Sequence, residues 1–168
     1  KLELNEIRYN TAVGNGGGIQ VSSTGGISII KNCLIQLNVS ETGSGGGLSY
    51  LSKYPLTIDA SVFDLNQTNG TSSIIGGSAI YFNGAHIIFV NTVFARNVSK
   101  SNKGAVLNAG GTLDVYNCTF SFNTSTGAVS ISNSDSGKTM VINSILWNNG
   151  SKDEVNGDGF TINVTCIT

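Results

Sequence analysis

The stretch NCTFSFN, residues 117–123, is one copy of a pattern that recurs along the whole chain and indicates its fold. Each copy has a bulky apolar residue at its fourth position and asparagine at its seventh. The other copies are LNEIRYN (4–10), NCLIQLN (32–38), ASVFDLN (60–66), NTVFARN (91–97) and NSILWNN (143–149). The closing asparagines follow one another at intervals of 28, 28, 31, 26 and 26 residues. Such a period is typical of a solenoid, in which each repeat buries its apolar face against its neighbours.

Two further segments follow each copy. A glycine-containing corner comes first, as in GGGIQV (16–21), GGGLSY (45–50), GGSAIYF (76–82), GAVLNA (104–109) and GAVSIS (127–132). An alternating or β-branched segment comes next, as in GISIIKN (26–32), LTIDA (56–60), HIIFVN (86–91), TLDVYN (112–117) and TMVINS (139–144). These segments are too short for helices and predict strands, with Gly or Asn at corners where positive φ costs these residues little. We therefore predict an all-β fold, a right-handed parallel β-helix solenoid of about six coils with three short strands each, as a single domain over residues 1–168.

The repeat also predicts columns of side chains along the stack, because equivalent residues of parallel coils lie about 4.8 Å apart. The inward apolar column contains Ile7, Ile35, Phe63, Phe94, Phe120 and Leu146. The closing asparagines form a ladder of amides, as stacked asparagines do in cross-β structures. Its members are Asn10, Asn38, Asn66, Asn97, Asn123 and Asn149. A less regular column contains Asn32, Asn91, Asn117 and Asn143, with Leu4 and Ala60 at the remaining positions.

The pairing of an FxxN motif with a later glycine, alanine and aliphatic segment resembles the repeats of polymorphic outer membrane proteins. It stands here as FARN (94–97) with GAVL (104–107), FSFN (120–123) with GAVS (127–130), and FDLN (63–66) with GGSAI (76–80). The resemblance covers nearly the whole chain at the level of single repeats. It implies a right-handed parallel β-helix at a cell surface, with adhesion or structural display as the usual role.

The composition is that of an extracellular protein with a polar, weakly charged surface. Charged residues make up 11% of the sequence and the net charge is −1, so we expect no nucleic-acid partner. No apolar run reaches the roughly 18 residues of a membrane helix, so we expect no membrane span. The stretch GFTINVTCIT (159–168) aligns with GKTMVINSIL (137–146), and neither end carries a polar capping element. We expect a segment of a longer β-helix, or a subunit that stacks end to end on copies of itself.

The cysteines are expected to be free. Aligning the repeats places three cysteines and three small polar residues in one column: Cys33, Ser61, Thr92, Cys118, Ser144 and Cys166. The cysteines lie on coils two, five and seven, about 10 Å or more apart, which is beyond disulfide reach. We expect buried thiols, with an intermolecular bridge through Cys166 as the alternative. A CxxC motif is absent and the chain has one His, so we expect neither a zinc site nor another cofactor.

Asn-x-Ser/Thr sequons are numerous and suggest a secreted glycoprotein. They occur at Asn38, Asn66, Asn69, Asn97, Asn117, Asn123, Asn149 and Asn163. Five coincide with the ladder, where an inward asparagine cannot carry a glycan. We predict Asn69 as the best candidate for glycosylation and Asn163 as the next, with Asn117 and Asn149 as further candidates.

Parallel β-helices include polysaccharide lyases and hydrolases, which need paired carboxylates or calcium-binding acids on one face. The aspartates fall in different phases of the repeat: Asp59, Asp64, Asp114, Asp135, Asp153 and Asp158. Asp64 and Arg96 are expected to be too isolated to form a cluster, and His86 has no neighbouring carboxylate pattern. For the acidic group Asp153, Glu154 and Asp158, a solvated turn is favoured over a calcium site. We therefore predict no catalytic residue.

The sequence thus favours a non-catalytic extracellular β-helix with a structural or adhesive role, as part of a surface appendage, a filament or a large surface glycoprotein. Its expected partners are copies of itself or adjoining β-helix segments end to end, and glycans or a host surface. One alternative is a carbohydrate-binding adhesin passenger domain, for which Tyr54, Tyr81 and Trp147 offer a stacking surface. Another alternative is a polysaccharide lyase or hydrolase. Acids clustered on one face would favour the enzyme, whereas rows of outward Ser, Thr and Asn would favour the structural role.

Overall fold

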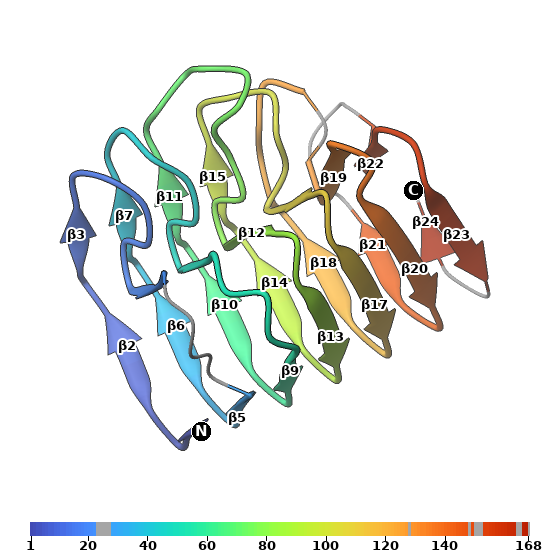
Figure 1. Ribbon diagram of the computed structural model, residues 1–168, viewed down its shortest axis with the longest axis horizontal. Helices are drawn as coiled ribbons and strands as arrows, with labels where there is room; N and C mark the ends of the chain where they lie inside the picture. Colours follow the sequence, from blue (N-terminus) through green and yellow to red (C-terminus); the bar gives the residue numbers. More distant parts are fainter. Residues whose placement is uncertain (23–27, 128, 148, 150–152, 164–165, 168) are drawn as a thin grey trace.

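The computed structural model describes residues 1–22, 28–127, 129–147, 149, 153–163 and 166–167. These residues form short parallel strands wound into a stack of coils, and none of them is helical. Figure 1 shows the coils side by side, with the two ends of the chain at opposite ends of the stack. The predicted all-β parallel solenoid is confirmed. Within this described part, no helix has the length and apolar character needed to cross a membrane.

The coils build four parallel sheets, which we call A, B, C and D in the order in which the chain enters them. Sheet A contains β1 (Leu2–Glu3), β5 (Ile29–Lys31), β9 (Leu56–Asp59), β13 (His86–Val90), β17 (Thr112–Tyr116), β20 (Lys138–Ile142) and β23 (Phe160–Asn163). Sheet B contains β2 (Glu6–Arg8), β6 (Leu34–Gln36), β10 (Val62–Asp64), β14 (Val93–Ala95), β18 (Thr119–Ser121), β21 (Ile145–Trp147) and β24 (Cys166–Ile167). Sheet C contains β3 (Thr11–Ala12), β7 (Val39–Ser40), β11 (Gln67–Thr68) and β15 (Val98–Ser99). Sheet D contains β4 (Ile19–Val21), β8 (Leu48–Tyr50), β12 (Ile80–Asn83), β16 (Val106–Ala109), β19 (Ile131–Ser134) and β22 (Val155–Asn156).

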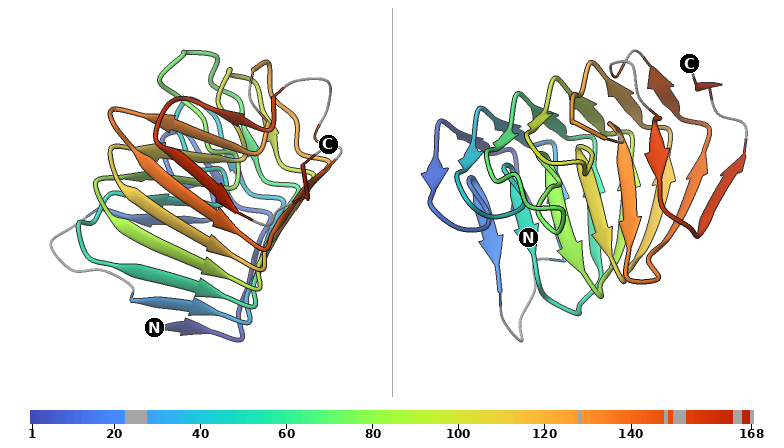
Figure 2. Two further views of the ribbon diagram at one scale, coloured as in Figure 1. Left: turned by 90° about the vertical axis from the view of Figure 1, so that its right-hand side faces the viewer. Right: turned by 90° about the horizontal axis from the view of Figure 1, so that it is seen from above.

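Sheets A, B and D correspond to the three strands predicted for each coil. Among the described residues, sheets A and B have seven strands each and sheet D has six, in keeping with the predicted number of coils. Sheet C corrects the prediction, because the first four coils carry a fourth strand of two residues directly after the ladder asparagine. Two residues are too few to show the alternation by which a strand is found in a sequence. Figure 2 shows the strands of all four sheets stacked along the axis, with sheets A and B meeting at a sharp corner.

The inward apolar column is confirmed. Strand register places Ile7, Ile35, Phe63, Phe94, Phe120 and Leu146 above one another in sheet B. The ring of Phe94 stacks on Phe63 and on Phe120, with centroid distances of 5.3 and 4.6 Å. All three rings are fully buried, so the column forms the centre of a core that continues from coil to coil.

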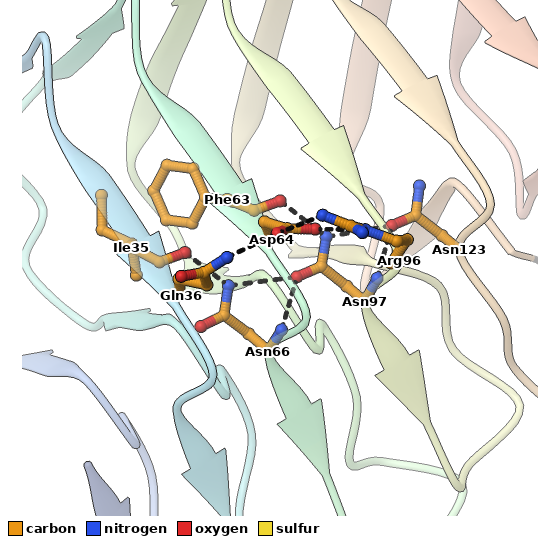
Figure 3. Close-up of polar contacts among 8 residues, drawn as sticks. All are labelled: Ile35, Gln36, Phe63, Asp64, Asn66, Arg96, Asn97 and Asn123. Atoms are coloured by element: carbon orange, nitrogen blue, oxygen red, sulfur yellow. Dashed lines mark hydrogen bonds and ion pairs between the residues drawn. The ribbon is translucent and has the colours of Figure 1, made fainter. Parts of the chain in front are cut away.

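The asparagine ladder is also confirmed, and Figure 3 shows its central rungs. The side-chain amide of Asn97 donates to Oδ1 of Asn123 at 2.9 Å and to the carbonyl of Phe63 at 2.9 Å. Its own Oδ1 accepts from the backbone and the side-chain amide of Asn66, at 3.0 and 3.1 Å. The same donations recur along the column between Asn38 and Asn149, whose side chains are fully buried. Every rung therefore ties two neighbouring coils together.

The corner between sheets B and C has an unexpected feature, because positive φ falls on the residue before the ladder asparagine in the first five coils. These residues are Tyr9 (φ 59°), Leu37 (56°), Leu65 (54°), Arg96 (54°) and Phe122 (57°). We expected Gly or Asn at the corners, but all five are larger side chains that adopt this conformation at a cost. The corner between sheets A and B follows the expectation more closely. Its positive-φ residues are Leu4, Asn32, Ala60, Asn91, Asn117 and Asn143.

The last coil is one residue out of the predicted register. The alignment on glycine placed Phe160 opposite Lys138, but the structure pairs Phe160 with Thr139 and Cys166 with Ile145. Cys166 therefore belongs to an outward column of sheet B and is exposed. Cys33 and Cys118 remain in the inward column and are buried free thiols, as predicted.

Candidate functional site

The most distinctive surface lies on the outer side of sheet B, beside the corner that contains the asparagine ladder. Register aligns one outward side chain from each coil into a row: Arg8, Gln36, Asp64, Ala95, Ser121 and Trp147. Arg96 comes directly after Ala95 in the fourth coil, and Phe122 comes directly after Ser121 in the fifth. Both residues have positive φ. We call the central part of this surface the corner face, and its members are Gln36, Asp64, Ala95, Arg96, Ser121, Phe122 and Trp147.

One half of the corner face is a polar cluster around Asp64 (Figure 3). Nε of Arg96 donates to Oδ1 of Asp64 at 2.8 Å, and Nη2 of Arg96 donates to Oδ2 at 2.6 Å. Nε2 of Gln36 donates to the same Oδ2 at 2.8 Å. The three side chains come from three successive coils, so the cluster spans the stack. Two parallel bonds between a guanidinium and a carboxylate fix both groups in one plane.

This cluster corrects the expectation that Asp64 and Arg96 are isolated. Asp64 is outward on β10, whereas Arg96 lies one position beyond β14, at the corner. The long arginine side chain reaches back across one coil spacing, which an alignment of equivalent positions does not reveal. The only sequence signal is opposite charge at adjacent positions of successive repeats, with Asp fifth in ASVFDLN and Arg sixth in NTVFARN.

The two charged partners differ greatly in exposure. The side chain of Asp64 is 5% exposed and that of Arg96 is 57% exposed. The hydrogen bond to Asp64, and then the charge of its carboxylate, raises the pKa of the Arg96 guanidinium above its ordinary value. Arg96 thus donates to both oxygens of the buried carboxylate and Gln36 donates to Oδ2, so the buried charge has the partners that it requires.

The other half of the corner face is aromatic. The rings of Phe122 and Trp147 meet edge to face, with centroids 5.8 Å apart and planes at 76°. Their side chains belong to successive coils and remain 50% and 46% exposed. In the row, the small, half-buried side chains Ala95 and Ser121 stand between Asp64 and Trp147.

The sequence grouped Trp147 with Tyr54 and Tyr81, but the structure does not bring these three rings together. Tyr81 is half-buried in β12 of sheet D, and Tyr54 lies in the connection between β8 and β9. Trp147 lies in sheet B. Its aromatic partner is Phe122, which the sequence analysis did not single out.

The ladder continues beyond its last asparagine to a buried carboxylate. Nδ2 of Asn149 donates to Oε2 of Glu154 at 2.8 Å, and the hydroxyl of Ser130 donates to the same oxygen. Glu154 is 6% exposed, whereas Asp153 and Asp158 are exposed. The acidic group was predicted to form a solvated turn, and this holds for the exposed Asp153 and Asp158 but not for the buried Glu154. Glu154 takes the place of the next amide acceptor of the ladder.

Two further acids are paired between coils. His86 lies 2.9 Å from Oδ2 of Asp114, which corrects the expectation that this histidine has no carboxylate neighbour. Nζ of Lys31 lies 2.9 Å from Oδ2 of Asp59, and this carboxylate raises the lysine's pKa by hydrogen bonding and by charge. In the part of the chain that the structure describes, no three His, Cys, Asp or Glu side chains are grouped so that they could hold a metal ion.

The four candidates for glycosylation occupy different environments. Asn117 and Asn163 are exposed, in the corner between sheets A and B and at the end of β23. Asn69 is half-buried, and its Nδ2 donates to Glu41 at 2.7 Å. Asn149 is fully buried, and its Nδ2 donates to Glu154 and to the carbonyl of Phe120. A glycan on the Asn149 nitrogen is therefore incompatible with the ladder.

Comparisons with known protein families, curated proteins and solved structures give no match to this chain. The parallel β-solenoid therefore rests on the chain's own repeats and strand register.

Proposed function

We propose that the chain is a non-catalytic structural and adhesive segment of an extracellular β-solenoid. The observation that carries the proposal is the unbroken asparagine ladder, in which the buried amides from Asn38 to Asn149 connect successive coils. Regular hydrogen bonding of this kind favours a stiff stack that holds outward side chains at fixed spacing.

The pairing of acidic with basic side chains across neighbouring coils supports the same structural role. Asp64 is paired with Arg96, Asp114 with His86, and Asp59 with Lys31, in each case across neighbouring coils. A hydrolase or lyase would direct its acids toward a substrate on one face. In this chain these acids instead contribute to cohesion between coils.

The two end coils support stacking on further coils of the same kind. Core side chains of the first and last coils are only partly covered, and they include Leu2, Ile7, Ile19, Val21, Val155 and Phe160. Ile162 on the outermost strand of sheet A is 40% exposed, although its partner Val141 is fully buried. Strand edges with apolar side chains are templates for pairing with another strand. Adjoining coils or a second copy would cover them.

Negative-stain electron microscopy and sedimentation of the purified chain test the proposal. We expect rod-shaped particles that lengthen with protein concentration. Ile162→Lys should prevent the lengthening, because it places a charge on the end of the stack. Ile145→Lys is the matched control, since Ile145 is 46% exposed on the outer side of sheet B rather than at an end. Compact particles that stay monomeric at all concentrations, or equal effects of both variants, would contradict stacking through the ends.

A further inference from the structure

The corner face places two exposed aromatic rings and a pre-arranged polar cluster on one outward surface of sheet B. We propose that this face binds a neutral oligosaccharide. One sugar ring would stack on the Phe122–Trp147 pair, and hydroxyl groups further along would bond to Gln36 and to the N–H groups of Arg96 that do not donate to Asp64. This inference rests on the adhesive role proposed above and gives that role a ligand class.

The aromatic pair provides the stacking surface. In an edge-to-face pair, the ring that contributes its edge keeps both of its own faces free of its partner. With 50% of Phe122 and 46% of Trp147 exposed, apolar ring surface of this pair is open to solvent. The C–H face of a pyranose ring is flat and apolar, so it fits such a surface while its hydroxyls point outward.

The polar cluster provides hydrogen-bonding groups that are already held in place. Two of the five N–H groups of Arg96 donate to Asp64, and the side chain is 57% exposed, so further donors face solvent. The backbone behind the cluster is fixed by the ladder, since Asn97 follows Arg96 in the chain and donates to the carbonyl of Phe63, directly before Asp64. Side chains fixed in this way lose little freedom when a ligand binds.

The charge of the face favours a neutral ligand. The carboxylate of Asp64 neutralises the guanidinium of Arg96, and the other members, Gln36, Ala95, Ser121, Phe122 and Trp147, carry no charge. An acidic glycan would require a cation that is not already paired. Asp64 and Trp147 lie three coils apart in one row, which corresponds to about 14 Å at the spacing of parallel strands. That length suits a short oligosaccharide laid along the stack axis.

A glycan array of neutral, sialylated and uronate-containing oligosaccharides tests the inference, followed by calorimetry with the neutral oligosaccharide that is best retained. We expect Trp147→Ala and Phe122→Asn each to weaken binding at least about tenfold. Asparagine suits the positive φ of residue 122, so that variant removes the ring while favouring the backbone conformation. Tyr54→Ala is the matched control, because Tyr54 is 55% exposed but lies outside the corner face. Thermal unfolding of each variant verifies that it is folded.

The site is overturned if no neutral oligosaccharide is retained, if only acidic glycans bind, or if both ring variants bind as tightly as the unmodified chain. Its failure is distinguishable from failure of the structural role. Rods that lengthen with concentration but retain no glycan would remove the binding site and leave the solenoid scaffold. Glycan binding by compact particles that never associate would support the binding site and contradict stacking through the ends.

Discussion

Left-handed backbone conformation at residues other than Gly or Asn stores strain at both corners of sheet B. An L-residue other than Gly or Asn adopts such a conformation at a cost of about 1 to 2 kcal/mol. At the corner between sheets A and B, four of the six positions carry asparagine, and Ala60 (φ 47°) is one of the two that do not. Ala60 is exposed and lies beside a shallow depression that leaves room for a larger side chain.

Ala60→Asn should therefore stabilise the chain by about 0.5 to 1 kcal/mol. Asparagine tolerates positive φ, and its amide would lie between Asn32 and Asn91 of the neighbouring coils. The midpoint of urea unfolding measures the effect. The reverse substitution Asn91→Ala should lower stability by a similar amount, and a loss of stability in Ala60→Asn would show that strain is not released there.

The buried carboxylate of Glu154 should be needed as an acceptor rather than as a charge. It receives hydrogen bonds from Asn149 and Ser130, so Glu154→Ala leaves two buried donors without their acceptor. We expect that substitution to cost about 2 to 3 kcal/mol of unfolding free energy. Glu154→Gln keeps an oxygen acceptor of the same shape and should lose less than half as much. Urea unfolding and hydrogen exchange near Asn149 measure both variants, and equal losses would mean that the charge itself is essential.

At the scale of elements, the ladder should be strongest at its centre. Asn97→Ala removes the acceptor used by the backbone and side chain of Asn66, and it also removes the donor to Phe63 and Asn123. These groups are buried, so we expect a loss of at least about 3 kcal/mol. Asn10→Ala is the matched control, because Asn10 is exposed and belongs to the first rung, and it should cost less than about 1 kcal/mol. Similar losses at both positions, measured by urea unfolding, would contradict a ladder held mainly by its buried rungs.

The elements also differ in how well the sequence predicts them. The columns of Phe94 and Asn97 were predictable, because a solenoid places one residue type at the same depth in every coil. Sheet C was not, because its strands are two residues long. The corner at Arg96 was not, because Tyr, Leu, Arg and Phe share no preference for positive φ. The candidate site was missed for a related reason, since its contacts join non-equivalent positions, as Arg96 and Asp64 do.

For the whole molecule, the reactivity of the three cysteine thiols measures whether the coils open together or separately. Cys33 and Cys118 lie inside the second and fifth coils and are 3% and 1% exposed, whereas Cys166 is exposed. We expect one thiol to react with a disulfide reagent in the folded chain and all three to react after unfolding in urea. Cys166→Ser should abolish the fast reaction. Rapid labelling of Cys118 in that variant would mean that the central coils open independently of the others, against the nearest-neighbour coupling of a solenoid.

The buried thiol of Cys118 makes the free energy of unfolding depend on pH in the alkaline range. Burial raises the pKa of Cys118 from 9.0 to about 11. The unfolded thiol therefore ionises first, so the stabilising contribution is fully present below about pH 9 and is lost as pH rises toward 11. Between pH 8 and pH 10 the unmodified chain should lose about 1 kcal/mol more unfolding free energy than Cys118→Ser. Serine suits this column, because the hydroxyl of Ser144, on the next coil, donates to a backbone carbonyl two residues earlier, as the thiol of Cys118 does. Parallel pH profiles for the two proteins in urea unfolding would show that Cys118 does not titrate in the folded coil as its burial requires.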